Sequence, residues 1–499
     1  MWKFLSYKHH TIKKIDLYSI HLILAIAKKS NMEETNHQQI NFFSECSIKP
    51  KYEVKASKQP HYLASIDLMF LSLDHMQKGL LFHAKPQNIQ SQLLDKLKIS
   101  LSYALVYFYP LAGQLATQKF PDEHAIWVYV DCTTGPGARL IHAVIDFSVS
   151  DLLSSCDIHP VVPSLFDLGE KAVNYDGHTR PLLSVQVTEL IDGVFIGFTM
   201  NHCLADGTSL WHFISTLSEI FVQLKDENHN DNNLTKTEVS SMDITVSRKP
   251  IYKPYFPEGY GPIIKLPYLE PDEFVYRFDP GVLRERIFHF SSKTMSILKA
   301  KANEECDNVI STFQALSAFI WTSITRVRNL EPSIRIICSF ALSWRTRITP
   351  PFSQECFGNY IEGVQCASKV RDLLGLGLGS TALLIRQSVE SIDDTEIQKR
   401  LHNYAKAPYV PQTGSRSAYY EPNGVLIAGS AKFDMYGPEF GLGKAVAVLA
   451  GYANKDDGKV TLNPGRKGGG SVDAEICLKP ETMNALESDE EFMSSVSIK

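Results

Sequence analysis

The residues that could do chemistry lie together in one short segment, Met200–Gly207, which reads MNHCLADG. His202 follows an apolar run, and an imidazole with an ordinary pKa near 6.5 can act as a general base at neutral pH. Asp206 lies four residues further along the chain, after a turn. It could therefore brace the loop or contact the imidazole ring of His202. The segment therefore predicts a proton-accepting histidine near a loop carboxylate.

Two other uses of this segment stay open from the residues alone. The spacing H-x-x-x-D arises by chance in long chains, and His202 could be a core histidine beside a loop-capping aspartate. His202, Asp206 and His212 could instead form a two-histidine, one-carboxylate metal site. Because His212 follows Trp211 on an apolar helix and lacks the spacing of a familiar third ligand, we expect no metal.

Composition limits the classes of protein to consider. The chain has 499 residues, of which 44% are hydrophobic and 21% charged, so it can bury the cores of two or three globular domains. Lys and Arg number 50 against 55 Asp and Glu, and this net charge of -5 argues against nucleic acid as a partner. The nine cysteines form no C-x-x-C pair and no zinc spacing, which predicts a reducing, cytoplasmic location.

The N-terminal stretch differs from the rest of the chain. Residues 1–40 are first basic and then polar, and we interpret them as a disordered appendage outside the fold. Leu17–Ala27 is apolar but too short to cross about 30 Å of hydrocarbon as a helix. Lys28 and Lys29 follow it in place of a small-residue cleavage site, so we expect neither a membrane span nor a signal peptide.

The elements around His202 can be predicted from periodicity. Leu182–Leu190 and Val194–Met200 are apolar runs across an Asp-Gly turn, which indicates a β-hairpin. Residues 209–224 repeat apolar side chains at helical spacing. His202 therefore lies in a turn between a strand and a helix, where functional residues concentrate.

The chain divides into two α/β halves. We expect an N-terminal domain over residues 41–224, a polar and then Pro/Gly/Tyr-rich linker over 225–282, and a C-terminal domain over 283–499. Strands expected in the second domain include Ile334–Leu342, Lys444–Tyr452 and Val472–Leu478.

H-x-x-x-D-G is complete at His202, Asp206 and Gly207, and a second motif, EFGLGK, follows at Glu439–Lys444. In this order the two motifs resemble H-x-x-x-D-G and D-F-G-W-G, the hallmarks of the plant BAHD acyl-CoA-dependent acyltransferases. Lesser blocks that resemble the family are YPLAG at 109–113, LRER at 283–286, RTR at 345–347 and FGN at 357–359. The resemblance covers residues 45–492.

The resemblance implies a fold and an activity. It implies two similar-sized domains, each with a mixed β-sheet flanked by helices as in chloramphenicol acetyltransferase, and an active-site channel at their interface. It also implies a monomer that moves an acyl group from acyl-CoA, a co-substrate rather than a permanent cofactor, to the hydroxyl or amine of a specialised metabolite.

The resemblance also implies roles for residues. His202 would be the general base, and Asp206 a structural brace through a salt bridge to Arg345 or Arg347. The family's Thr-Ser-Trp-like triplet reads Ala-Gly-Ser here, which leaves Ser430 as a side-chain oxyanion donor. The remaining expected residues are Glu439 in a structural second motif and Arg345, Asn359 and Lys444 as CoA contacts.

Two departures from the family pattern keep other functions open. Glu439 replaces the usual Asp and Leu442 the usual Trp, as in a subgroup that includes a pathogen-defence member with lyase activity. A CoA-independent lyase on the same fold and a non-catalytic binding descendant are therefore the alternatives to acyl transfer.

Overall fold

The structure, a computed structural model, describes residues 40–168, 172–224, 244–306, 309–411 and 423–497. Phe42–Lys499 forms one compact unit. The appendage predicted over residues 1–40 lies outside the described residues apart from Ile40, so it stays a prediction.

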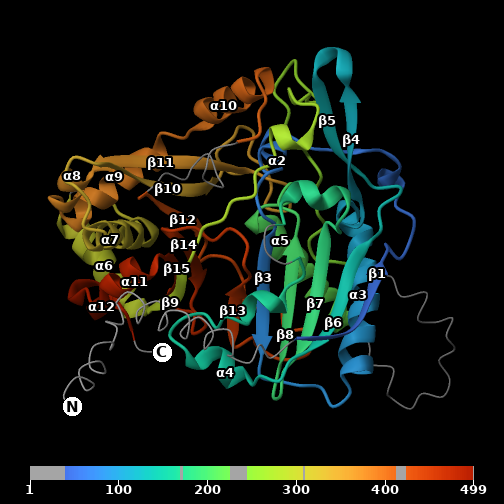
Figure 1. The fold of residues 1–499 in the computed structure, drawn as a ribbon, viewed down its shortest axis with the longest axis horizontal. Helices are drawn as coiled ribbons and strands as arrows, with labels where there is room; N and C mark the ends of the chain where they lie inside the picture. The colour runs from blue at the N-terminus through green and yellow to red at the C-terminus, as the bar shows by residue number, and fades with distance from the viewer. Residues whose placement is uncertain (1–39, 169–171, 225–243, 307–308, 412–422, 498–499) are drawn as a thin grey trace, which may run out of the picture. The chain divides into compact units, whose positions relative to one another are not determined.

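The first sheet carries the strand that leads to His202 (Figure 1). Within it, β6 and β7 are parallel, whereas β7, β8, β3 and β13 are antiparallel neighbours. The predicted hairpin is confirmed, with Leu183 of β7 opposite Met200 of β8. In sheet order the strands are β1 (Asn41–Ile48), β6 (Ala138–Val144), β7 (Leu183–Glu189), β8 (Val194–Met200), β3 (Met76–Phe82) and β13 (Ala447–Ala450).

The second sheet is also mixed, because β12 is parallel to both of its neighbours whereas the outer pairs are antiparallel. Its order is β11 (Ile361–Lys369), β10 (Arg335–Ser343), β12 (Val425–Gly429), β14 (Lys459–Pro464), β15 (Val472–Leu478) and β9 (Arg284–Phe290). A small third sheet joins β2 (His61–Tyr62), β5 (Ala125–Asp131) and β4 (Gln114–Phe120).

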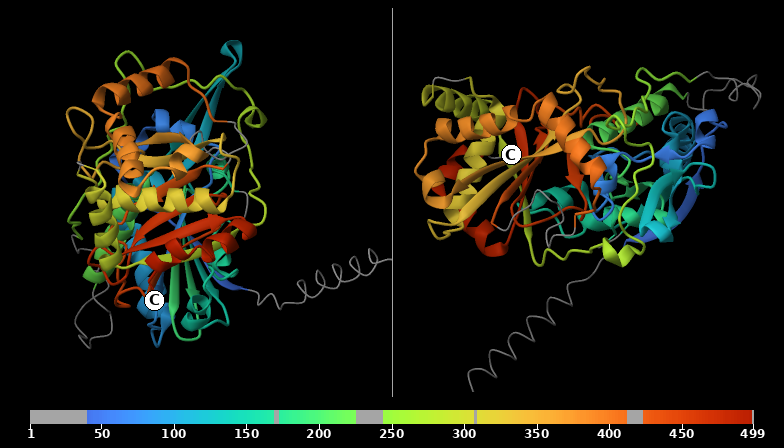
Figure 2. Two further views of the ribbon diagram at one scale, coloured as in Figure 1. Left: turned by 90° about the vertical axis from the view of Figure 1, so that its left-hand side faces the viewer. Right: turned by 90° about the horizontal axis from the view of Figure 1, so that it is seen from above.

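Helices accompany both large sheets, which confirms the predicted α/β class (Figure 2). α3 contacts α5 beside the first sheet, and α6, α7 and α9 contact one another beside the second. No described helix has the length and apolar character needed to cross a membrane. The helices are α2 (Ser65–Met69), α3 (Lys96–Tyr107), α4 (Val149–Ser154), α5 (Gly207–Gln223), α6 (Ser292–Glu304), α7 (Thr312–Val327), α8 (Val370–Leu374), α9 (Leu378–Glu390), α10 (Asp394–Lys406), α11 (Pro480–Glu487) and α12 (Glu490–Ser495).

One strand belongs to a different sheet from the one predicted. The sequence indicates a strand over 444–452 and assigns it to the C-terminal domain, but β13 pairs with β3 of the first sheet. An apolar run predicts that a strand forms, whereas its partner depends on where the chain crosses over in three dimensions. The predicted domain bounds stay a prediction.

The described part of the predicted linker, residues 244–282, has only the short 3-10 turn Pro271–Glu273 and isolated β-bridges. Its backbone pairs at Leu266 with Ile126 and at Ile251 with Cys356. The segment therefore contacts residues of both predicted halves. The other linker residues, 225–243, lie outside the described part of the chain.

Gly79 of β3 allows a tight contact with β8, because a Cβ at this position would overlap the ring of Phe195. We expect Gly79→Ala to lower the free energy of unfolding by about 1–3 kcal/mol through overpacking, as measured by urea denaturation. If the ring is the cause, Phe195→Leu in the same chain should be less destabilising than the sum of the two single changes. Full additivity would contradict this explanation.

Candidate active site

His202 lies in the turn between β8 and α5, as predicted. Hydrogen bonds hold its backbone on both sides: its N–H donates to Asn174 Oδ1 at 2.7 Å, and its carbonyl accepts from Asn359 Nδ2 at 2.7 Å. The Phe70 ring packs against the imidazole in a T-shaped contact, with the centroids 4.6 Å apart. The ring position is therefore set by side chains from three distant segments.

Burial lowers the pKa of His202 below its ordinary 6.5, because desolvation disfavours the charged imidazolium. The positive charge of Lys459 acts in the same direction, whereas Asp206 and hydrogen bonds oppose it. Nδ1 is buried and has no hydrogen-bond partner among the described residues. Burial therefore favours the neutral form of the ring, which is the form that can accept a proton.

Asp206 is the N-cap of α5 and forms a buried bidentate salt bridge with Arg345. Its Oδ1 accepts from the Ser209 N–H at 3.0 Å, which satisfies a free amide of the first helical turn. Arg345 Nη1 donates to Oδ2 at 2.6 Å and Nη2 to Oδ1 at 3.0 Å, and both side chains are 0% exposed. The predicted brace is thus present, and Arg345 is the partner.

The two arginines considered for this bridge have different surroundings. Arg347 donates instead to the carbonyls of Val389 and Ile392. Arg345 also donates to the Cys356 carbonyl at 3.0 Å and lies 4.6 Å from the centre of the Tyr360 ring. Because its guanidinium is fully enclosed, the predicted contact of Arg345 with CoA is not supported.

Asp67 is a residue of this network that the sequence analysis missed. It lies in α2, and its Oδ1 accepts from Asn359 Nδ2, the same amide group that holds the His202 carbonyl, at 2.8 Å. Burial raises its pKa to about 7, with a smaller contribution from the charge of Asp206. Asn359 is thus occupied in positioning the His202 loop. A lone Asp in SIDLM offers no sequence signal of this role.

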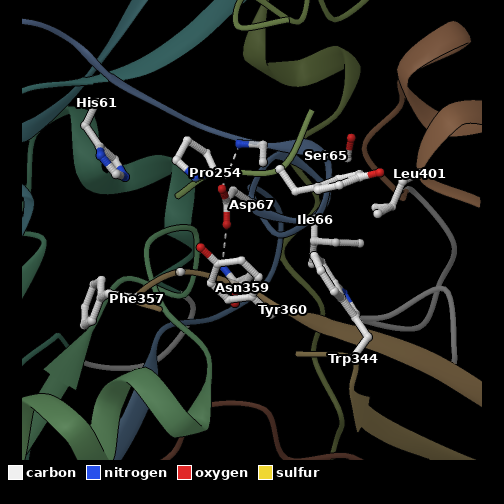
Figure 3. A pocket seen from close by; sticks show the side chains of 13 residues that line it. His61, Ser65, Ile66, Asp67, Pro254, Trp344, Phe357, Asn359, Tyr360 and Leu401 are labelled. Atoms are coloured by element: carbon white, nitrogen blue, oxygen red, sulfur yellow. Dashed lines mark hydrogen bonds between the residues drawn. The ribbon is translucent and has the colours of Figure 1, made fainter. Parts of the chain in front are cut away.

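A cavity with about 390 Å³ of empty space, part of it open to solvent, borders this network (Figure 3). Asp67 and Asn359 form its polar wall, and Phe357 and Trp344 are among its aromatic lining. Ser65 Oγ, Trp344 Nε1 and Asn359 Oδ1 are buried without a hydrogen-bond partner in the described chain. The cavity therefore offers unused donors and acceptors next to the His202 loop.

The second motif packs on α5 far from the histidine. The N–H groups of Glu439 and Phe440 lie 3.1 and 3.3 Å from Ser218 Oγ, and the Phe440 ring contacts Phe221 with centroids 5.8 Å apart. Ser218 is about 18 Å along the helix from Asp206 at about 1.5 Å per residue. The Glu439 side chain is exposed. This placement favours the structural role expected for the motif.

Ser430 and Lys444 are the other predicted site residues. Ser430 follows the end of β12, and its Oγ accepts from the Lys432 N–H at 3.2 Å. Lys444 is exposed and donates to the Arg466 carbonyl at 3.2 Å. Their expected roles as oxyanion donor and CoA contact stay predictions.

The metal interpretation of His202, Asp206 and His212 finds no support in the geometry. His212 Nε2 lies 3.0 Å from the Arg248 carbonyl, and Asp206 uses both oxygens in its bonds to Arg345. Across the described ranges, no group of three His, Cys, Asp or Glu side chains is placed to hold a metal ion.

Comparison with known proteins decides the family. Residues 38–493 match the Transferase family profile. An uncharacterised acetyltransferase from Arabidopsis thaliana is 33% identical over 458 residues, covering 91% of this chain and 98% of that protein. The BAHD acyltransferase DCR of the same plant is 30% identical over 479 residues, covering 92% and 93%. The chain belongs to the BAHD acyltransferase family.

The BAHD fold is also evident in solved structures. Vinorine synthase superimposes with a TM-score of 0.64 at 19% identity, covering 92% of this chain and 99% of that one. TRI101 of F. sporotrichioides, solved with coenzyme A and T-2, gives a TM-score of 0.67 at 21% identity and covers 88% and 99%. These matches show the fold, two mixed sheets flanked by helices, and the family membership shows that the chain is an enzyme, an acyltransferase.

The bridge between Asp206 and Arg345 makes a testable contribution to stability. Arg345→Met leaves a buried carboxylate without its cation, and we expect it to lower the free energy of unfolding by about 3–5 kcal/mol in urea titrations. Combining it with Asp206→Asn should recover part of this loss, because the unpaired charge is then removed.

Arg371→Ala serves as the control, since Arg371 and Asp372 form an exposed pair with side chains 65% and 56% accessible. It should leave stability close to the wild-type value. A loss in Arg345→Met no larger than in this control would contradict the importance of the buried bridge.

Proposed function

We propose that this BAHD protein transfers an acyl group from a CoA thioester to a hydroxyl or amine acceptor, with His202 as the general base. The observation that carries the proposal is the buried His202 imidazole, held by its backbone between Asn174 and Asn359 at the end of β8. A base must be deprotonated before it acts, and burial favours that form by lowering the pKa of the ring.

His202 alone can carry the proton transfers of the proposed reaction. His202 accepts the proton of the acceptor O–H or N–H while the acceptor atom bonds to the thioester carbonyl carbon. The tetrahedral intermediate then expels the CoA thiolate, which takes the proton back from the imidazolium. No acyl-enzyme is formed, and the enzyme needs no permanently bound cofactor.

Other residues position the His202 loop or stabilise charge on the reacting groups. Asp206 keeps the β8–α5 turn in place through Arg345 and carries no proton in the reaction. The developing oxyanion requires hydrogen-bond donors, for which Ser430 and backbone amides are our candidates. Lys444 is our candidate contact for CoA, because it is an exposed cation. We further propose that the enzyme acts as a cytoplasmic monomer.

His202→Ala tests the role of the base. We expect it to reduce CoA-dependent thiol release by about 100- to 10,000-fold, because general-base assistance is lost. The assay follows free thiol with acetyl-, malonyl-, benzoyl- and hydroxycinnamoyl-CoA and a plant extract as acceptor. Far-ultraviolet circular dichroism verifies that the variant is folded. Turnover of the extract without CoA would favour a lyase, and equal activity of both proteins would reject His202 as the base.

The pH dependence follows from the lowered pKa of His202. Burial lowers the pKa of His202 below its ordinary value of 6.5, so the ring becomes protonated only in more acidic solution. We therefore expect kcat/KM to stay constant around pH 7 and to fall at lower pH. Lys459→Met removes a charge that lowers this pKa, so its acid limb should move to higher pH. Lys299→Met, which changes an exposed lysine of α6, should not move it. An acid limb above 6.5 in the wild type would contradict this assignment.

A further inference from the structure

The cavity beside the His202 loop has no task in the mechanism above (Figure 3). It lies where three parts of the chain meet: residues 61 and 64–67 of the N-terminal half, residues 254–255 of the linker, and residues 344, 357–360 and 401 of the C-terminal half. His202 is not among the described residues that line it. Small-molecule sites commonly lie where domains meet, so this cavity is a candidate binding site separate from the imidazole.

Three polar side chains in the wall of the cavity have no hydrogen-bond partner in the described parts of the chain. The unpartnered atoms are Ser65 Oγ, Trp344 Nε1 and Asn359 Oδ1. Their residues are only 1%, 1% and 6% exposed, and a buried polar group left unpaired is costly. The indole can only donate, the amide oxygen can only accept, and the hydroxyl can do both. A ligand that both donates and accepts would therefore complement this wall.

The wall also presents aromatic rings. The Trp344 ring packs in T-shaped contacts against Tyr360 and Tyr255, with centroids 5.2 and 5.9 Å away. The rings of Phe357 and His61 complete this lining. Aromatic walls favour a flat ring as the ligand. The empty space of about 390 Å³, part of it open to solvent, is at the small end of the usual range of about 300–1,000 Å³, which suits a single ring.

The charges around the cavity disfavour an ionic ligand. None of the described lining residues is Lys or Arg, so an anion would find no cation in the wall. Asp67 is the one carboxyl among these residues, and its oxygens already accept from the Ala64 N–H at 2.7 Å and from Asn359 Nδ2 at 2.8 Å. Burial lowers the pKa of His61 to about 4, so its imidazole carries no charge at pH 7. An ion would therefore lose its hydration without gaining a free partner of opposite charge.

We propose that this cavity is a binding site for a small neutral phenol. The ring would lie among the aromatic side chains, and the hydroxyl would pair with at least one of the unpartnered atoms of Ser65, Trp344 and Asn359. This site goes beyond the proposed acyl transfer, because binding requires neither CoA nor turnover. Its wall nevertheless reaches the catalytic loop, since Asn359 Nδ2 also donates to the His202 carbonyl at 2.7 Å.

Ligand-detected NMR titration of the full chain tests the ligand class with phenol and toluene, which differ only by a hydroxyl in place of a methyl group. We expect phenol to bind about 10-fold or more tightly than toluene, because only its hydroxyl can pair with a buried polar group. Equal affinities, or absence of phenol binding, would overturn the proposal. Benzoate and benzylamine test the charge, and tighter binding of either ion than of phenol would overturn the neutral ligand class.

Ser65→Ala and Trp344→Phe test the location, because each removes one unpartnered polar group from the wall. We expect them to weaken phenol binding by about 5- to 30-fold and to leave toluene binding unchanged. Ser317→Ala and Trp321→Phe are matched controls in α7, since Ser317 Oγ and Trp321 Nε1 are equally buried and unpartnered among the described residues but lie outside the cavity lining. These controls should bind phenol as the wild type does.

Phenol affinity that is unchanged in both cavity variants, or lowered as much in the controls, would place phenol elsewhere and overturn the proposal. Thermal unfolding verifies that each variant is folded. If Trp344→Phe does not fold, Ser65→Ala is paired with Ser65→Val, which removes the same hydroxyl and narrows the cavity. Loss of phenol affinity in neither serine variant would then overturn the site.

The phenol can belong to a substrate of the acyl transfer or be a separate small molecule, and inhibition kinetics in the thiol-release assay distinguish the two. Competition of phenol with the acceptor or with acyl-CoA assigns the site to that substrate. An effect without competition, or no effect on the rate, assigns it to a separate ligand. Phenol binding that persists in His202→Ala while no donor releases thiol with the wild type would reject the proposed function and leave the binding site in place.

Discussion

The buried salt bridge between Asp206 and Arg345 is the constraint on which the active-site loop depends. It joins the start of α5, beside the first sheet, to the segment that follows β10 of the second. Two enclosed charges are costly to bury, and they are tolerated because the bridge is bidentate and further hydrogen bonds satisfy both groups. The ends of β8 and β10 are thereby held together, and His202 has a defined position between them.

Around this bridge, the protein controls the histidine through its backbone. The amides of Asn174 and Asn359 hold its N–H and carbonyl, and Asp67 holds Asn359 in turn. The imidazole itself is left with a buried, unpartnered Nδ1. Burial and the charge of Lys459 lower its pKa, so the environment that encloses the ring also favours its neutral form.

Contacts between segments far apart in the sequence complete the arrangement. β13 crosses over to pair with β3, and Phe440 of the second motif packs on α5. This packing favours a role of the second motif in the scaffold rather than at the reacting atoms. Because the Glu439 side chain is exposed, the identity of this residue has little effect on the packing. Glu439 can therefore differ from the family pattern.

The sequence by itself determined the α/β class, the hairpin before His202, the helix after it and the resemblance to BAHD acyltransferases, because these depend on local periodicity and on spacing within short motifs. It also predicted that an arginine would brace Asp206, but not which one. The tertiary structure alone decided that Arg345 is that partner, that Asp67 and Asn174 support the loop, and that β13 belongs to the first sheet. These contacts join residues far apart in the chain, and no local pattern encodes which distant side chains folding brings within a few ångströms.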